Sequence, residues 1–164
     1  MNYPDVHCSY TEIVSLSDLV PNPRNPNKHP QKQVNLLAEI IQQQGWRSPI
    51  VVSKRSGFIV QGHGRHLAAK HLGLESAPVD YQDFDSDALE WAQVIADNRI
   101  AELSNIDKSL MADLICEIDT LSDLDLSLTA FSEAEIEKMM LAAPPQIENP
   151  SDPKACPNCG FILR

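Results

Sequence analysis

The sequence of 164 residues has no long uncharged apolar run. No window approaches the roughly 18 to 20 apolar residues that a membrane-spanning helix needs. The first thirty residues carry three carboxylates and five prolines, where a secretory signal would carry an apolar core. We therefore predict a soluble, cytoplasmic protein.

Cysteine is scarce, with four residues at positions 8, 116, 156 and 159. A chain long enough for one compact domain plus an appendage does not form a disulfide scaffold from so few cysteines. The four residues instead indicate reduced thiols or a bound metal, and a reducing compartment.

Cations are also few, because 13 Lys and Arg face 23 Asp and Glu for a net charge of −10. This balance argues against a protein that wraps nucleic acid. The charge is unevenly divided, since residues 1–82 carry +2 and all five histidines, whereas residues 83–164 carry −12. An anionic ligand therefore belongs to the N-terminal half.

Residue patterns in that half predict an α+β domain. We expect a short strand within residues 10–16, a loop that three prolines and three asparagines keep irregular over 21–27, and a helix over about 31–44. Residues 49–53 and 58–60 indicate a hairpin in which Gly57 supplies a positive φ. A helix over 66–72 and a strand over 77–82 follow.

The acidic half is predicted to be helical. A long helix capped by Ser86 has an apolar stripe that runs through Leu89, Ala92, Ile95, Ala96, Arg99, Ile100 and Leu103. Asp107 caps the next helix, with inward-facing Leu110, Leu114, Ile115 and Ile118. Residues 123–128 fit a strand or a loop, and Ser132 and Glu135 form a capping box for a last helix to about 141.

A predicted strand runs through Gly62 and Gly64 directly into a helix. Such a turn lets backbone N–H groups approach an anion at the positive end of the helix dipole. Arg65 falls in the first turn, where a cation opposes the dipole unless an anion is bound. His63 and His66 extend this cationic cluster. A plain glycine turn followed by a packing helix fits the same residues, so both interpretations stay open.

A second polar cluster lies over residues 95–102. The side-chain oxygens of Asp97, Asn98 and Glu102 can bind Mg²⁺ or a ribose, and Arg99 can grip a phosphate in bidentate fashion. A solvated helix face with a pair between Asn98 and Glu102 is the alternative.

Arg24, in the proline-rich loop and followed by Lys28 and His29, is a third candidate. Loops of this kind often hold a ligand from the side opposite a glycine turn.

Cys156 and Cys159, followed by Gly160, have the spacing of half a zinc knuckle. A tetrahedral Zn²⁺ site needs two further ligands, which a distant cysteine or histidine or a second copy of the chain would supply. A redox pair or an inert pair of thiols is the alternative.

In this order the segments resemble the ParB/sulfiredoxin superfamily, in particular the ParB-like N-terminal domains that are found in phages and plasmids and beside DNA methyltransferases. The first family box resembles residues 22–24, the central strand 49–52, the second box 62–69 and the third box 97–99. The likeness covers about residues 10–105. It implies a small mixed β-sheet with flanking helices, here followed by an acidic helical region.

Together with the proline-rich composition of 143–155, the resemblance divides the chain into a ParB-like domain at 8–105, a helical extension at 106–142, a linker at 143–155 and a C-terminal tail at 156–164. It implies that the second and third boxes bind a nucleoside triphosphate with Mg²⁺. Gly62, His63 and Gly64 would surround the phosphates together with Arg65, His66 and Arg99. Arg24 would contact the ligand from the loop. Asp97 and Asn98 would position Mg²⁺ or an attacking water.

Two departures limit what is carried over. Partition proteins have Gly-Glu-Arg-Arg where this chain has Gly62, His63, Gly64 and Arg65, so clamp-type CTP hydrolysis is not predicted. Sulfiredoxins need a cysteine beside this arginine, and His63 or Gly64 stands there, so sulfiredoxin activity is not predicted either.

Three functions follow as hypotheses. The leading one is a domain that binds a nucleoside triphosphate, with or without hydrolysis, in a DNA-related phage, plasmid or DNA-modification setting. The second is a metal-dependent nuclease that acts on DNA or RNA through the same residues. The third is a non-enzymatic adaptor whose acidic half docks a DNA-modifying or phage protein. A homodimer is compatible with each of the three.

Overall fold

The computed structural model describes residues 3–121 and 123–142. The predicted linker 143–155 and the tail with Cys156 and Cys159 lie outside the described residues. The described residues divide into two compact units, one made of those up to Ile106 with Leu128–Ala130 and the other of the remaining ones from Asp107 on. Each unit is described by itself below.

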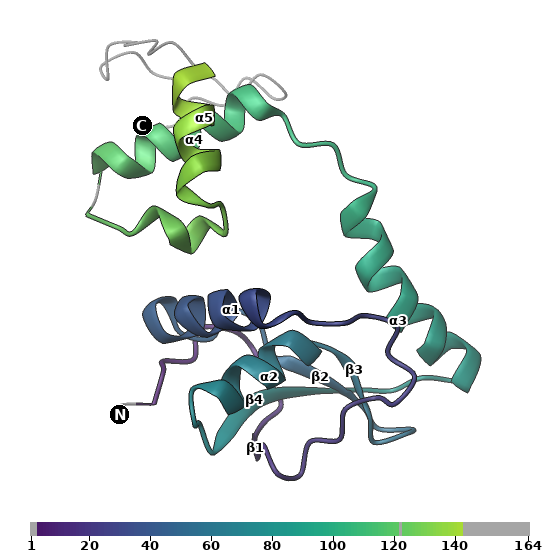
Figure 1. Ribbon diagram of the computed structural model, residues 1–164. Coiled ribbons are helices and arrows are strands. Elements are labelled where there is room, and N and C mark those ends of the chain that lie inside the picture. The colour runs from purple at the N-terminus through teal and green to yellow at the C-terminus, as the bar shows by residue number, and fades with distance from the viewer. Residues whose placement is uncertain (1–2, 122, 143–164) are drawn as a thin grey trace, which may run out of the picture. The chain divides into compact units, whose positions relative to one another are not determined.

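The first unit is built on a mixed four-stranded sheet, which confirms the predicted α+β class (Figure 1). β1 (Glu12–Ser15) pairs antiparallel with β4 (Ser76–Gln82), and β4 pairs parallel with β2 (Ile50–Ser53). β2 and β3 (Ile59–Gln61) form the predicted antiparallel hairpin, and Gly57 in its turn has a φ of 76°. The strand order is β1-β4-β2-β3.

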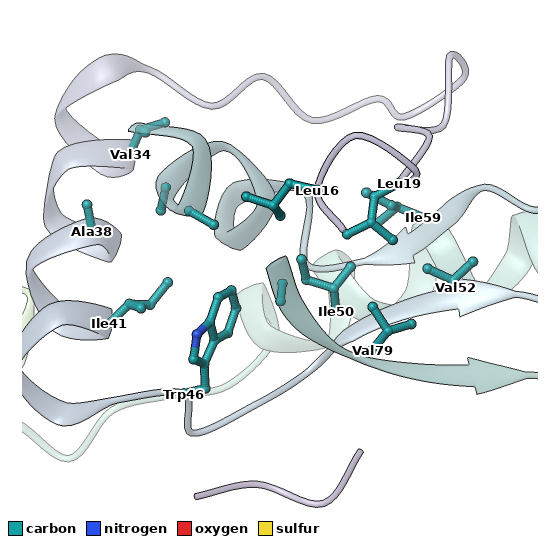
Figure 2. Packing of buried hydrophobic residues seen from close by; sticks show 13 residues of the cluster. Leu16, Leu19, Val34, Ala38, Ile41, Trp46, Ile50, Val52, Ile59 and Val79 are labelled. Carbon is teal, nitrogen blue, oxygen red and sulfur yellow. The ribbon is translucent and has the colours of Figure 1, made fainter. Parts of the chain in front are cut away.

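Two helices, α1 (Gln31–Gln44) and α2 (His63–His71), pack on each other over one face of this sheet (Figure 1). α1 has the bounds that the sequence predicts, because Gly45 ends the helix with a φ of 72°. Trp46 follows and is fully buried. Figure 2 shows the side chains that fill the space between the helices and the sheet, among them Leu16, Leu19, Val34, Ala38, Ile41, Trp46, Ile50, Val52, Ile59 and Val79.

α3 (Asp87–Glu102) packs on the hairpin through Val94, which joins Val51, Val60 and Phe84 in a second cluster. Because Val51 alternates with Ile50 and Val52 along β2, this cluster lies on the opposite face of the sheet. The predicted apolar stripe of α3 is wrong, since the structure leaves four of its members exposed: Leu89, Ile95, Ile100 and Leu103. The buried positions of α3 belong instead to Val94 and to a carboxylate, Glu90.

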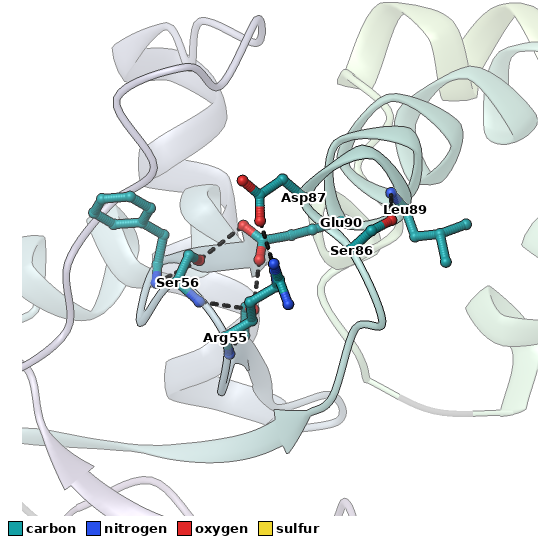
Figure 3. A network of polar contacts seen from close by, with 8 residues as sticks. Arg55, Ser56, Ser86, Asp87, Leu89 and Glu90 are labelled. Carbon is teal, nitrogen blue, oxygen red and sulfur yellow. Dashed lines mark hydrogen bonds and ion pairs between the residues drawn. The ribbon is translucent and has the colours of Figure 1, made fainter.

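Glu90 is only 1% exposed and ties α3 to the hairpin turn (Figure 3). Ser53 Oγ donates to one carboxylate oxygen at 2.6 Å and Ser56 Oγ to the other at 2.7 Å. The same hydroxyls accept backbone N–H bonds from Arg55, Ser56 and Phe58. The carboxylate therefore organises the turn and fixes the helix with one set of bonds.

The second unit contains α4 (Lys108–Leu121), a 3₁₀ turn (Leu126–Thr129, with Leu128 and Thr129 counted in the first unit) and α5 (Glu133–Ala142). The two predicted caps are confirmed. Asp107 accepts from the N–H groups of Ser109 and Leu110, and the Glu135 carboxylate accepts from the N–H of Ser132.

The predicted inward face of α4 is only partly correct. Ile115 is buried together with Ala112, whereas Leu110 and Leu114 are 58% and 47% exposed. α4 packs against α5, and contact with a single helix buries only a narrow stripe. Within the described residues, no helix is both long and apolar enough to cross a membrane.

We predict that Glu90→Ala lowers the free energy of unfolding by about 3 kcal/mol, because it leaves the buried Ser53 hydroxyl and the more exposed Ser56 hydroxyl without their acceptor and opens a cavity. Asp87→Ala is the matched control on the same helix, since Asp87 forms an exposed ion pair with Arg55 that is worth less than about 1 kcal/mol. Urea denaturation of both variants measures the difference, and equal losses would contradict the role given to Glu90.

Candidate functional site

A polar pocket of about 220 Å³ opens where β3 ends and α2 begins. It is lined by the loop before α1, by α1 itself, by the first turn of α2 and by α3. Six of the sequence-predicted residues meet here, namely Gly62, His63, Gly64, Arg65, Asp97 and Asn98. The glycine turn at 62–65 and the polar cluster at 97–98 are far apart in the chain, and they share one cavity.

The first turn of α2 supplies backbone donors to this pocket. Gly62 has a φ of 92°, which turns the chain from β3 into the helix. The helix starts at His63, three residues earlier than predicted, and its first bond runs from the N–H of His66 to the Gly62 carbonyl. The N–H groups of His63, Gly64 and Arg65 thus have no acceptor within the helix, and this is the usual arrangement at an anion site.

Gly64 lies inside α2, so it is not part of the turn. A Cβ added there would come within 2.9 Å of Leu37 Cδ1 and 3.3 Å of His29 Nδ1. A side chain at this position would push α1 and the preceding loop away from α2. The second glycine of the motif therefore has a packing role, which the plain interpretation of the sequence also allowed.

Arg65 folds back over the start of its own helix. Its Nη2 donates to the Pro49 carbonyl at 3.0 Å, and a Cβ added at Gly62 would come within 3.0 Å of the same nitrogen. Burial lowers the pKa of the guanidinium, and the attraction of Asp97 opposes this effect. Its Nε is buried without a hydrogen-bond partner among the described residues. The pocket thus contains a desolvated cation with an unused donor.

His63 anchors the proline-rich loop to the pocket. Its Nε2 accepts the backbone N–H of Asn22 at 3.2 Å, which joins the first and second sequence boxes. Burial, helped by the nearby His29 and His66, lowers the pKa of His63 to about 4. The ring is therefore neutral at physiological pH.

Three predicted ligand-binding residues lie elsewhere in the first unit. The guanidinium of Arg24 stacks on the Trp91 ring, 4.1 Å from its centroid. His66 is 1% exposed in the core, where burial and Lys70 lower its pKa. Arg99 forms an exposed ion pair with Glu102 at 2.8 Å.

The sequence did not single out several residues of the pocket wall, namely Asn25, Asn27, Gln33, Leu37, Val60 and Gln61, and it indicated His29 only as a neighbour of Arg24. The proline-rich loop was expected to reach the ligand, and it does line the pocket, but through its asparagines and His29 rather than through Arg24. The sequence also contained no sign that Cys8 lies near Arg65. Burial raises the pKa of the Cys8 thiol, and the nearby guanidinium of Arg65 opposes this effect. Cys8 stands 57 positions before Arg65, and no local signal connects the two.

The described residues contain no group of three or more His, Cys, Asp or Glu side chains placed to hold a metal. The pocket offers one carboxylate, Asp97, among amide side chains. Mg²⁺ that arrives on phosphate oxygens keeps several waters and needs only one or two carboxylates. The donor set therefore fits a ligand-borne Mg²⁺ and does not build a site for the ion alone.

Comparison with known proteins gives a family match over most of the first unit. Residues 5–109 match the ParB N-terminal domain. The ParB-like nuclease domain-containing protein YnaK of Escherichia coli is 41% identical over 64 residues, which make up 39% of this chain and 72% of YnaK. A ParB-like protein of Sulfolobus acidocaldarius is 32% identical over 87 residues, which cover 51% of this chain and 44% of that protein.

Among solved structures, the chain is similar to the C-terminally truncated chromosome-partitioning protein ParB of Caulobacter crescentus, complexed with CTP-γ-S. The TM-score is 0.62 at 21% identity, and the match covers 81% of this chain and 79% of that one. At this identity the likeness shows a common fold.

We predict that His63 makes stability depend on pH. Its pKa is about 4 in the folded state and about 6.5 when unfolded, so between these values the unfolded chain binds more protons. Stability is complete above about pH 6.5 and falls as the pH drops toward 4. His63→Gln, which keeps an acceptor for Asn22, should reduce this loss by about 1 kcal/mol after allowance for solvent screening.

The measurement is denaturant unfolding at about pH 7.5 and about pH 4.5. His66 also has a lowered pKa, so part of the dependence should remain in the variant. The exposed His71 provides the control, and His71→Gln should behave as the wild type. An unchanged loss in His63→Gln would contradict the neutral, buried state of His63.

Proposed function

The chain belongs to the family of ParB N-terminal domains, and on this premise we propose that the pocket at the start of α2 binds a nucleoside triphosphate. The observation that carries the proposal is the free first turn of α2, aimed into a polar cavity that also holds the desolvated Arg65. The Caulobacter ParB, of the same fold, is complexed with a CTP analogue.

In this proposal the phosphates bind in the polar pocket in front of the first turn of α2. The N–H groups of His63, Gly64 and Arg65 donate to phosphate oxygens, as helix N-termini commonly do. The unused Nε–H of Arg65 adds a charge-assisted bond. The polar side chains Asn25, Asn27 and Gln33, which also line the pocket, contact the rest of the ligand.

Mg²⁺ would accompany the nucleotide, with Asp97 as its protein ligand and Asn98 next to it. When bound, the ion would neutralise phosphate charge. Asn98 Nδ2 donates to the Val94 carbonyl at 2.9 Å, which leaves its amide oxygen for the ligand side. Glu90 and Val94 hold this part of α3 in place.

We predict that a saturating nucleoside triphosphate with Mg²⁺ raises the melting temperature, because a ligand at about 100 times its Kd adds about 2.7 kcal/mol to the native state. Arg65→Ala should weaken binding by about 10- to 100-fold, the value of a charged hydrogen bond. Lys70→Ala is the control, since Lys70 is an exposed cation on the same helix outside the pocket.

Thermal unfolding with ATP, CTP, GTP and UTP, each with and without Mg²⁺, followed by calorimetric titration, provides the measurement. Equal affinity in Arg65→Ala and the wild type would refute the proposed site. No shift with any triphosphate, together with nicking of plasmid DNA that Asp97→Asn abolishes, would instead support the nuclease hypothesis.

The second unit favours a second candidate function, docking of a basic partner. Residues 107–142 carry nine Asp and Glu against two Lys. An apolar groove of about 380 Å³ runs along α5, lined by Ile136, Met140 and Leu141 and bordered by Glu133 and Glu137. Apolar lining with an acidic rim is complementary to an amphipathic helix with a basic polar face. We propose such a helix as the occupant.

A synthetic helical peptide of Lys and Leu is the probe for this groove. We predict that Leu141→Glu weakens its binding at least about tenfold, because the variant places a charge on the apolar lining. Leu121→Glu is the matched control, since Leu121 is 81% exposed and Leu141 is 80% exposed, but only Leu141 lines the groove. Fluorescence anisotropy measures both affinities, and equal effects would contradict docking at this groove.

A further inference from the structure

His29 lies in the wall of the proposed nucleotide pocket, just before α1 begins. Its ring is close to the first turn of α2, because a Cβ added at Gly64 would come within 3.3 Å of Nδ1 and 3.4 Å of Cε1. Only glycine at position 64 allows this approach. The imidazole therefore sits beside the backbone donors that the proposed function assigns to phosphate.

Gln33, one turn along α1, determines which ring nitrogen of His29 carries the proton. Its amide Oε1 lies 3.0 Å from Nδ1. An amide oxygen only accepts hydrogen bonds, so the ring proton is on Nδ1. Nε2 is then the ring nitrogen that can accept, and this atom is buried without a partner among the described residues. A buried acceptor in this state is stabilised by an O–H group of a ligand or of water.

The other acid–base groups that line the pocket are already engaged. Nε2 of His63 accepts the N–H of Asn22. Asp97 faces the guanidinium of Arg65, whose charge it stabilises. Of the described acid–base groups in the lining, His29 is the one that has a basic atom with no assigned partner.

We propose that His29 is the general base for hydrolysis of the terminal phosphoryl group, an inference that rests on the proposed nucleotide binding. A water oxygen attacks the γ-phosphorus and forms a new P–O bond, while the bond from this phosphorus to the β–γ bridging oxygen breaks. The water proton passes to Nε2 of His29. The products are a nucleoside diphosphate, which leaves with the bonding electron pair, and inorganic phosphate.

This assignment gives the lining residues separate tasks. The N–H groups of α2 and Arg65 hold the anion, and Gln33 fixes the orientation of the His29 ring through Nδ1. Asp97 contributes to nucleotide binding and does not accept the proton of the attacking water. General bases contribute about 100- to 10,000-fold to such reactions, so the role of His29 is measurable apart from binding.

The test compares His29→Asn with the wild type, because the asparagine amide can still donate to Gln33 but has no atom at the position of Nε2. Nucleotide affinity is measured by calorimetry, and phosphate release is measured under single-turnover conditions with excess protein. We expect His29→Asn to bind within about threefold of the wild type and to release phosphate at least about 100-fold more slowly.

Two further variants separate a chemical role from a structural one. In His29→Ala, added imidazole should restore phosphate release, whereas it should not change release by the control His71→Asn, whose histidine is exposed outside the pocket. Asp97→Asn should weaken binding without abolishing release at saturating nucleotide.

Wild-type release rates in His29→Asn would overturn the inference. So would loss of release in Asp97→Asn with none in His29→Asn, or a wild type that binds nucleotide and releases no phosphate at all. In these cases nucleotide binding stands and the general base does not. A wild type that binds no triphosphate would overturn the proposed function, and the role of His29 with it.

Discussion

The buried carboxylate of Glu90 is the contact on which the geometry of the pocket depends. α3 has little apolar surface against the sheet, because Val94 is its one buried hydrophobic residue. Two hydroxyl bonds from the hairpin hold the helix instead. Asp97 lies two turns beyond Glu90, so a bond formed at the hairpin turn positions a carboxylate opposite Arg65. Directional polar bonds fix such a helix in one orientation more strictly than apolar contact does.

A second constraint is the close approach of three segments around the start of α2. Gly62 turns the chain, Gly64 admits Leu37 and His29, and His63 anchors the loop through the N–H of Asn22. These contacts bring the imidazoles of His29 and His63, the guanidinium of Arg65 and the free N–H groups of α2 into one pocket, whose single carboxylate is that of Asp97. Burial keeps His63 neutral and disfavours the charge on Arg65. A bound anion would favour the charge on Arg65, which is the electrostatic basis of the proposed function.

Local signals in the sequence predicted most elements of the fold. The helix at 31–44, the hairpin turn at Gly57 and the caps at Ser86, Asp107 and Ser132 depend on neighbouring residues, and the structure confirms them. The buried face of α3 was not predictable in this way, because a carboxylate occupies it and its partners lie on another element. The stacking of Arg24 on Trp91 and the placing of His29 in the pocket likewise depend on contacts between distant segments.

The most direct test of the account is the backbone amide spectrum of ¹⁵N-labelled protein during titration with a nucleoside triphosphate and Mg²⁺. The account predicts that the largest shifts occur at the amides of His63, Gly64 and Arg65, with Gly57 and Gly73 unaffected. Shifts that spare the first turn of α2, or that gather at the polar groove between the N-terminal segment and the end of α1, around Asp5 and Arg47, would contradict it.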